Sequence, residues 1–294
     1  MDIQKLWMVA EEAWSALAEQ FEPVAEQMCA QHDMEGRTFG LLLSVLTFEP
    51  EDTTPGHLMV RGPYTSADEF LNRLQGAADQ GFLIEIAQGR YRLSDEGRKC
   101  THNIADEIRR VMAKVDPLPL EDSGRLAELL DRLVQSCMNT PPPPNPWSIN
   151  LSYKLMPHLN PPMPFIEQAF SCLSAYRDDS HLAAWRRSGL SAIALESLTL
   201  LWRGETTSLA GLYNKLFQRG HSLGIYQGAL QELGNRGLVA GSDQAIRVTR
   251  AGKGFRNKIE ADTDKYFYLP WSCLKESEMS EMLALLTRMR DGLK

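Results

Sequence analysis

The chain has few of the features that define membrane proteins, secreted proteins and many enzymes. No run of about 18 apolar residues occurs in its 294 residues, so we expect no membrane-spanning helix. Charged residues interrupt the segment 1–20, which excludes the apolar core of a signal peptide. The Walker A, Gly-x-Gly-x-x-Gly and His-Glu-x-x-His patterns do not occur. We therefore expect neither an enzyme nor a bound cofactor.

Cysteine is scarce, and its spacing excludes two kinds of structural site. The five cysteines are odd in number and form no Cys-x-x-Cys pair, which excludes a disulfide framework and a zinc knuckle: Cys29, Cys100, Cys137, Cys172 and Cys273. They are typical of buried thiols in a reducing compartment, so we expect a cytoplasmic protein. His158, His181 and Cys172 show no ligand spacing such as His-x-x-x-His, and no metal site is predicted.

The charge of the chain is divided unevenly along its length. The total of -7 argues against a nucleic-acid partner, because phosphate contacts need clustered Lys and Arg. However, residues 1–140 carry 13 Lys and Arg against 24 Asp and Glu, a net of -11, whereas residues 151–294 carry 18 against 14, a net of +4. This asymmetry points to an interaction surface on one of the two halves.

Prolines cluster near the middle of the chain and predict a boundary there. They occupy positions 141–144, 146, 157, 161, 162 and 164, where they disfavour helix and sheet interiors. We predict an acidic unit over 1–140, a proline-rich linker over 141–164 and a basic unit over 165–294.

The two halves resemble each other at a spacing of about 155 residues, which indicates an internal repeat. The aligned residues are Leu74, Gln75 and Gly81 with Leu230, Gln231 and Gly237; Arg92–Ser94 with Arg247–Thr249; Gly97 with Gly252; and Ile104 with Ile259. Apolar spacing in the second half predicts helices near 195–201, 209–217 and 222–236, a hairpin over 238–249, and helices over 251–266 and 276–292. The first half repeats this with helices over 41–48 and 66–80, a hairpin over 82–93, and helices over 104–115 and 126–134. The predicted fold is mainly α with small β wings, in two tandem units; the resemblance described next implies that these are winged helix-turn-helix units that could form a fused pseudo-dimer.

This order of elements resembles the winged helix-turn-helix proteins of MarR type. A closer resemblance, to the SalK-like bacterial group, covers residues 176–293 through YRDDSHLAAWRRSGLS, RGHS, ELGNRGLV, VTRAGKGFRNKIEADTD and PWSCL. The resemblance implies a DNA-binding transcriptional regulator with base-reading residues on its third helix and a basic wing.

Eight residues of the second half are the predicted DNA contacts. They lie at the start of the third helix or along the wing: Arg219, His221, Ser222, Tyr226, Gln227, Arg247, Arg250 and Lys253. The alternative for the basic residues is an ordinary solvated surface. The matching helix of the first half begins with Asp68 and Glu69, so we expect that half not to read DNA.

Two further partners are predicted from the apolar residues. Trp185 and Trp202 are candidates for binding a small apolar ligand at a seam between helices, although core packing is the alternative. The Met-rich last helix suits a core or a homodimer interface. Asp179 and Ser180 are interpreted as the N-cap of a helix that starts near His181. The competing function is a winged-helix scaffold that binds proteins or small molecules and no DNA.

Overall fold

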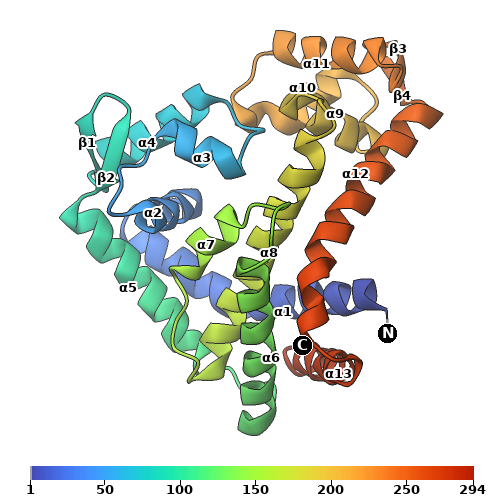
Figure 1. Cartoon of the computed structure of the whole chain (residues 1–294). Helices are drawn as coiled ribbons and strands as arrows, with labels where there is room; N and C mark the ends of the chain where they lie inside the picture. Colours follow the sequence, from blue (N-terminus) through green and yellow to red (C-terminus); the bar gives the residue numbers. More distant parts are fainter. Residues whose placement is uncertain (1) are drawn as a thin grey trace.

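The computed structural model describes residues 2–294 as a mainly helical protein with two small antiparallel hairpins, which confirms the predicted fold class (Figure 1). The first half contains α1 (Ile3–Gln31), α2 (Gly36–Phe48), α3 (Pro55–Arg61), α4 (Ala67–Asp79), β1 (Leu83–Ala87), β2 (Arg90–Leu93), α5 (Asp95–Met112) and α6 (Leu120–Met138). After α7 (Trp147–Tyr153), the second half contains α8 (Pro162–Arg186), α9 (Ala192–Trp202), α10 (Leu209–Leu216), η1 (Phe217–Arg219), α11 (Leu223–Asn235), β3 (Val239–Ser242), β4 (Ala245–Val248), α12 (Arg250–Tyr268), η2 (Leu269–Cys273) and α13 (Glu276–Gly292). No helix within the described residues is both long enough and apolar enough to cross a membrane.

The two halves place equivalent elements in the same order. Each has a long helix, three shorter helices, a hairpin and two closing helices, so that α1 to α6 correspond to α8 to α13. Leu83 pairs with Leu93 in the first hairpin, and Val239 pairs with Val248 in the second. Figure 1 shows the two hairpins at opposite edges of the molecule.

The joint between each hairpin and the helix after it has the same geometry in both halves. Ser94 caps α5 through the Gly97 N–H and donates its hydroxyl proton to the Gly81 carbonyl. Thr249 caps α12 through the Gly252 N–H and donates in the same way to the Gly237 carbonyl. A Cβ atom at Gly97 would lie 1.9 Å from the Phe82 carbonyl oxygen, and one at Gly252 would lie 2.0 Å from that of Leu238. Glycine is therefore required at both joints.

A shared hydrophobic core connects the halves in a reciprocal way. The first helix α1 packs on the last helix α13, and α8, the first helix of the second half, packs on α6, the last of the first half. Buried side chains from all four helices form one cluster, including Leu17, Leu133, Phe170 and Leu286. Each half adds a smaller core of its own. Their relative position is therefore set by packing rather than by a tether.

The proline-rich segment 141–164 is part of this packed body. It contains α7, whose Ser148 and Ile149 are buried, and α7 packs on α8. The Asp179 carboxylate accepts hydrogen bonds from the backbone N–H groups of Ser148 (2.9 Å) and Ile149 (3.1 Å). Burial raises the pKa of Asp179 to about 6. The interpretation of Asp179 and Ser180 as an N-cap is wrong, because both lie inside the 25-residue helix α8. The domain boundaries stay a prediction.

We predict that Gly97→Ala and Gly252→Ala each lower the free energy of unfolding by about 1–3 kcal/mol, because the new methyl group overlaps a backbone carbonyl that cannot withdraw. Gly254→Ala is the matched control, since it lies in the same helix as Gly252 with no atom near the added Cβ, and should gain up to about 1 kcal/mol. Urea titration measures all three. Equal effects at Gly252 and Gly254 would contradict the requirement for glycine.

Candidate nucleic-acid interface

The second half contains a helix-turn-helix built from α10 and α11. Ser208 caps α10 through the Gly211 N–H (3.1 Å), and Gly220 reverses the chain at φ 73°. Ser222 then precedes α11, which buries Tyr226, Ala229, Leu230 and Leu233 along one face. The hairpin β3–β4 follows as a wing that leads directly into α12.

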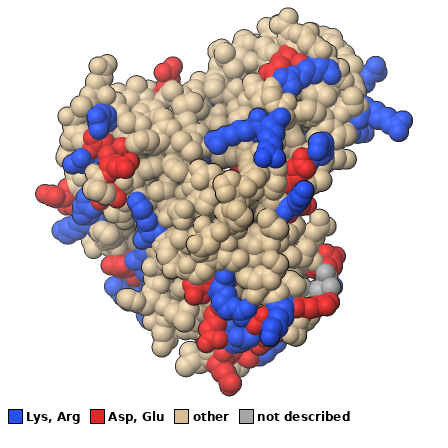
Figure 2. Space-filling model, viewed as in Figure 1, with Lys and Arg blue, Asp and Glu red and all other residues tan. Residues whose placement is uncertain are grey.

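Three cations at the wing are exposed and unpaired. Arg247 lies on β4, and Arg250 and Lys253 lie in the first turn of α12. None of the three forms an ion pair within residues 2–294. In contrast, the neighbouring cations are paired: Arg236 with Glu232, Arg256 with Glu260, and Lys258 with Asp262. Figure 2 shows basic side chains projecting from this edge, at the upper right. Together with exposed Ser222 and Gln227, they account for five of the eight predicted contacts.

The structure places the other three predicted contacts away from this face. Arg219 pairs with Glu196 at 2.7 Å and donates to the Thr65 hydroxyl at 3.3 Å. His221 donates from Nε2 to the Tyr64 carbonyl at 3.0 Å. Tyr226 is fully buried, and its hydroxyl donates to the Leu216 carbonyl. These side chains hold the helix-turn-helix together and fix it to the first half.

The turn before α11 is covered by the start of α4 from the first half. The Ser66 N–H donates to the Arg219 carbonyl at 2.9 Å, and Arg73 donates to the Gln218 carbonyl at 2.9 Å. A Cβ atom at Gly220 would lie 2.5 Å from the Cβ of Glu69. The acidic first turn of α4 therefore lies directly beside the helix-turn-helix.

The same turn contains a sequence pattern that the sequence analysis missed. Gly220–Gly224 reads GHSLG, the Gly-x-Ser-x-Gly pattern that presents a serine nucleophile between a strand and a helix in many hydrolases. Here the 3-10 helix η1 precedes the pattern, where hydrolases have a strand. The ring of His221 donates a hydrogen bond to the Tyr64 carbonyl. The pattern therefore serves as a turn and helix start in this fold.

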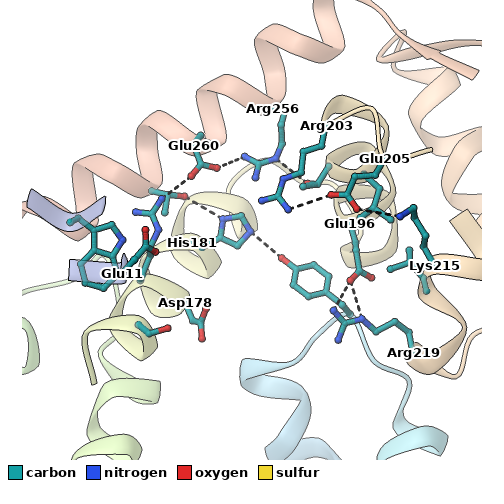
Figure 3. Close-up of a pocket in the computed structure, with 18 residues that line it drawn as sticks. Glu11, Asp178, His181, Glu196, Arg203, Glu205, Lys215, Arg219, Arg256 and Glu260 are labelled. Carbon is teal, nitrogen blue, oxygen red and sulfur yellow. Dashed lines mark hydrogen bonds and ion pairs between the residues drawn. The ribbon is translucent and has the colours of Figure 1, made fainter. Parts of the chain in front are cut away.

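A cleft of about 710 Å³ lies between α8, α9, α10 and α12, beside Tyr64 of the first half (Figure 3). Its walls carry basic and acidic side chains that form ion pairs with one another. Arg177 binds Glu260 at 2.9 Å and Asp264 at 3.0 Å, while the buried Arg256 binds Glu260 at 2.7 Å. These pairs neutralise one another, so this wall presents a polar surface with little net charge.

His181 connects the two halves at the centre of this cleft. The Thr263 hydroxyl donates to the Ile259 carbonyl, so it accepts from His181 Nδ1 at 3.3 Å. Nε2 of the neutral ring is then the acceptor, and the Tyr64 hydroxyl donates to it at 3.0 Å. Burial, assisted by the positive charge of Arg256, lowers the pKa of His181. The neutral ring is thus the form that this contact stabilises.

Neither predicted ligand residue lines the cleft. Trp185 is buried and donates its indole N–H to the Leu190 carbonyl at 2.8 Å. Trp202 is half-buried, and the Arg256 guanidinium lies 5.3 Å from its ring centre. A second cavity of about 510 Å³ has a more apolar lining, which includes Phe48, Phe70 and Trp147.

The comparisons with known proteins agree with this geometry. The model of a helix-turn-helix family matches residues 156–293. Neither the curated proteins nor the solved structures give a match. The second half therefore contains a helix-turn-helix domain, and the predicted helix-turn-helix is confirmed there.

We predict that the folded protein loses stability as the pH falls through about 6.5, in part because of His181. The folded state resists protonation of this ring, whereas the unfolded chain takes up the proton near the ordinary pKa of 6.5, so acid favours unfolding. Denaturant titrations between pH 5 and pH 8 should show a smaller loss in His181→Gln than in the unaltered protein. Parallel loss in both proteins would contradict this role of His181.

Proposed function

We propose that the protein is a cytoplasmic, DNA-binding transcriptional regulator of MarR-like winged-helix type, which contacts double-stranded DNA mainly through its second half. The observation that carries this proposal is the set of exposed, unpaired cations Arg247, Arg250 and Lys253, located where a wing adjoins a helix-turn-helix. None of the three cations forms an ion pair with a carboxylate of the described residues. Such cations supply the affinity for phosphate.

The polar residues of α11 have the chemistry for reading bases. Ser222 and Gln227 are exposed at the beginning of this helix, the part that faces base edges in winged helix-turn-helix proteins. The hydroxyl and amide groups can each donate and accept hydrogen bonds. In this proposal they supply sequence preference, and the wing supplies most of the affinity.

We further propose that the two halves arose by duplication and form a fused pair in which one half no longer binds DNA. The matching joints at Gly97 and Gly252 and the reciprocal packing of the long helices support this history. The first half carries Asp68 and Glu69 where a DNA-reading helix would begin. Glu69 pairs with Arg73 at 2.7 Å, whereas the Asp68 carboxylate would repel phosphate. It therefore acts as a support for the second half.

A small apolar ligand and a homodimer remain part of the proposal. The cavity lined by Phe48, Phe70 and Trp147 suits such a ligand better than the polar cleft. It also reaches Tyr64, whose carbonyl accepts a hydrogen bond from His221, and Arg219, which belongs to the turn before α11. A ligand there would act on the helix-turn-helix through these two residues. A homodimer would present two reading helices to one operator.

One observation favours a second candidate function, a scaffold that binds a protein or small molecule and no DNA. The exposed face of α11 contains no Lys or Arg, and Leu223 and Ile225 on this helix are 46% and 48% exposed. The two candidates differ in their response to salt, because only phosphate binding releases condensed counterions.

We predict that duplex DNA binds the full-length protein with an affinity that falls as salt rises. Arg250→Ala and Lys253→Ala should each reduce the slope of log affinity against log salt by about 1, because each removes one phosphate contact. Fluorescence anisotropy over a salt series measures the slope.

Lys258→Ala is the matched control for this experiment, since Lys258 lies on the same helix but is paired with Asp262. It should leave the slope unchanged. An absence of binding to any duplex at low salt would exclude the regulator and favour the scaffold.

A further inference from the structure

Three side chains of metal-binding type meet in the first half, away from the proposed DNA interface. His32 follows the end of α1, while Glu96 and Cys100 lie one turn apart on α5. The Cys100 sulfur lies 3.4 Å from His32 Nδ1 and 3.3 Å from Glu96 Oε1. All three candidate ligand atoms lie within 4.8 Å of one another.

The two distances from the Cys100 sulfur match those between ligands around one tetrahedral zinc ion. Zinc binds sulfur at about 2.3 Å and nitrogen or oxygen at about 2.0–2.2 Å, which places neighbouring ligand atoms about 3.5 Å apart. The two sulfur distances are already close to this value. An ion can therefore be coordinated with only small side-chain movements.

The burial of the three residues gives the ion a route of entry. Cys100 is 1% exposed and forms the floor of the cluster, whereas His32 is half-buried and Glu96 is exposed. The ion would approach from the side of Glu96 and His32 and meet the sulfur last. A water molecule would take the fourth position, as in zinc sites with three protein ligands.

We propose that His32, Glu96 and Cys100 bind one zinc-like divalent ion, with a water molecule as the fourth ligand. The bond from the metal to sulfur replaces the S–H bond of Cys100, and the released proton passes to solvent. Because the metal binds the thiolate and displaces this proton, affinity should rise with pH.

The position of the site gives the ion a structural consequence. α1 belongs to the shared core, and α5 follows the first hairpin and packs against α1. A metal that joins His32 to α5 would connect the end of α1 to the first winged unit. Local sequence spacing could not reveal the site, because 64 positions separate His32 from Glu96 and only Glu-x-x-x-Cys is a local signal.

Cobalt and zinc titration of the full-length, chelator-treated protein tests this proposal. We expect one equivalent of Co²⁺ to bind with the absorption bands of a tetrahedral ion and a thiolate-to-metal charge-transfer band, and Zn²⁺ to displace it. Cys100→Ser should abolish the charge-transfer band. His32→Gln and Glu96→Gln should each weaken binding at least tenfold.

His102→Gln and Cys273→Ser are the matched controls, because one alters an exposed histidine on the same helix and the other a thiol elsewhere; both should bind like the unaltered protein. If Cys100→Ser does not fold, the two surface ligands still decide the result. A lack of stoichiometric binding, or equal binding by His32→Gln and Glu96→Gln, would overturn the site. The cobalt absorption and its displacement by zinc are both measured without DNA, so failure of this proposal is distinguishable from failure of the proposed DNA binding.

Discussion

The structure depends on reciprocal packing between the long helices of its two halves. α1 of the first half packs on α13 of the second, and α8 of the second half packs on α6 of the first, so the largest core is built from both halves. Aromatic side chains add to the contact between the two halves. The ring centre of Trp7 on α1 lies 4.8 Å from that of Phe267 on α12 and 6.2 Å from that of Trp271 on η2, both in edge-to-face geometry. Because helices of both halves form this core, the halves cannot move apart without exposing its apolar side chains to water. The contact between α4 and the turn before α11 then fixes their orientation.

On this common scaffold the two winged units differ mainly in charge. The joints after the two hairpins contain equivalent hydrogen bonds, made by Ser94 with Gly81 and Gly97 and by Thr249 with Gly237 and Gly252. Their surfaces differ, because the helix equivalent to α11 begins with acidic residues whereas the second wing has unpaired cations. In the proposed function, one fold thus carries an acidic supporting half and a basic half that binds phosphate. The total charge of -7 therefore does not exclude a nucleic-acid partner.

Local signals were sufficient for the hairpins, the joints and the helices around them, but they did not predict α1, α3 or the full length of α8. They also did not reveal the contacts between the halves. The alignment of Gly97 with Gly252 paired two glycines with the same geometry, because both meet a backbone carbonyl. In contrast, the polarity of Arg219 and His221 gave no indication that they bind Thr65 and Tyr64, about 155 positions away. Tyr226 was predictable as buried, since it starts the apolar series that continues through Ala229, Leu230 and Leu233. The helix α7 was hidden by the prolines around it.

The shared core is tested most directly by native-state hydrogen exchange of the full-length protein, measured by mass spectrometry in rising denaturant. If α1 and α13 depend on each other, amides near Leu17 and Leu286 should open with the same free energy and the same denaturant dependence. Those of the hairpins should open more easily. Exchange of α1 at low denaturant, while α13 and α8 stay protected, would contradict a core that the halves share.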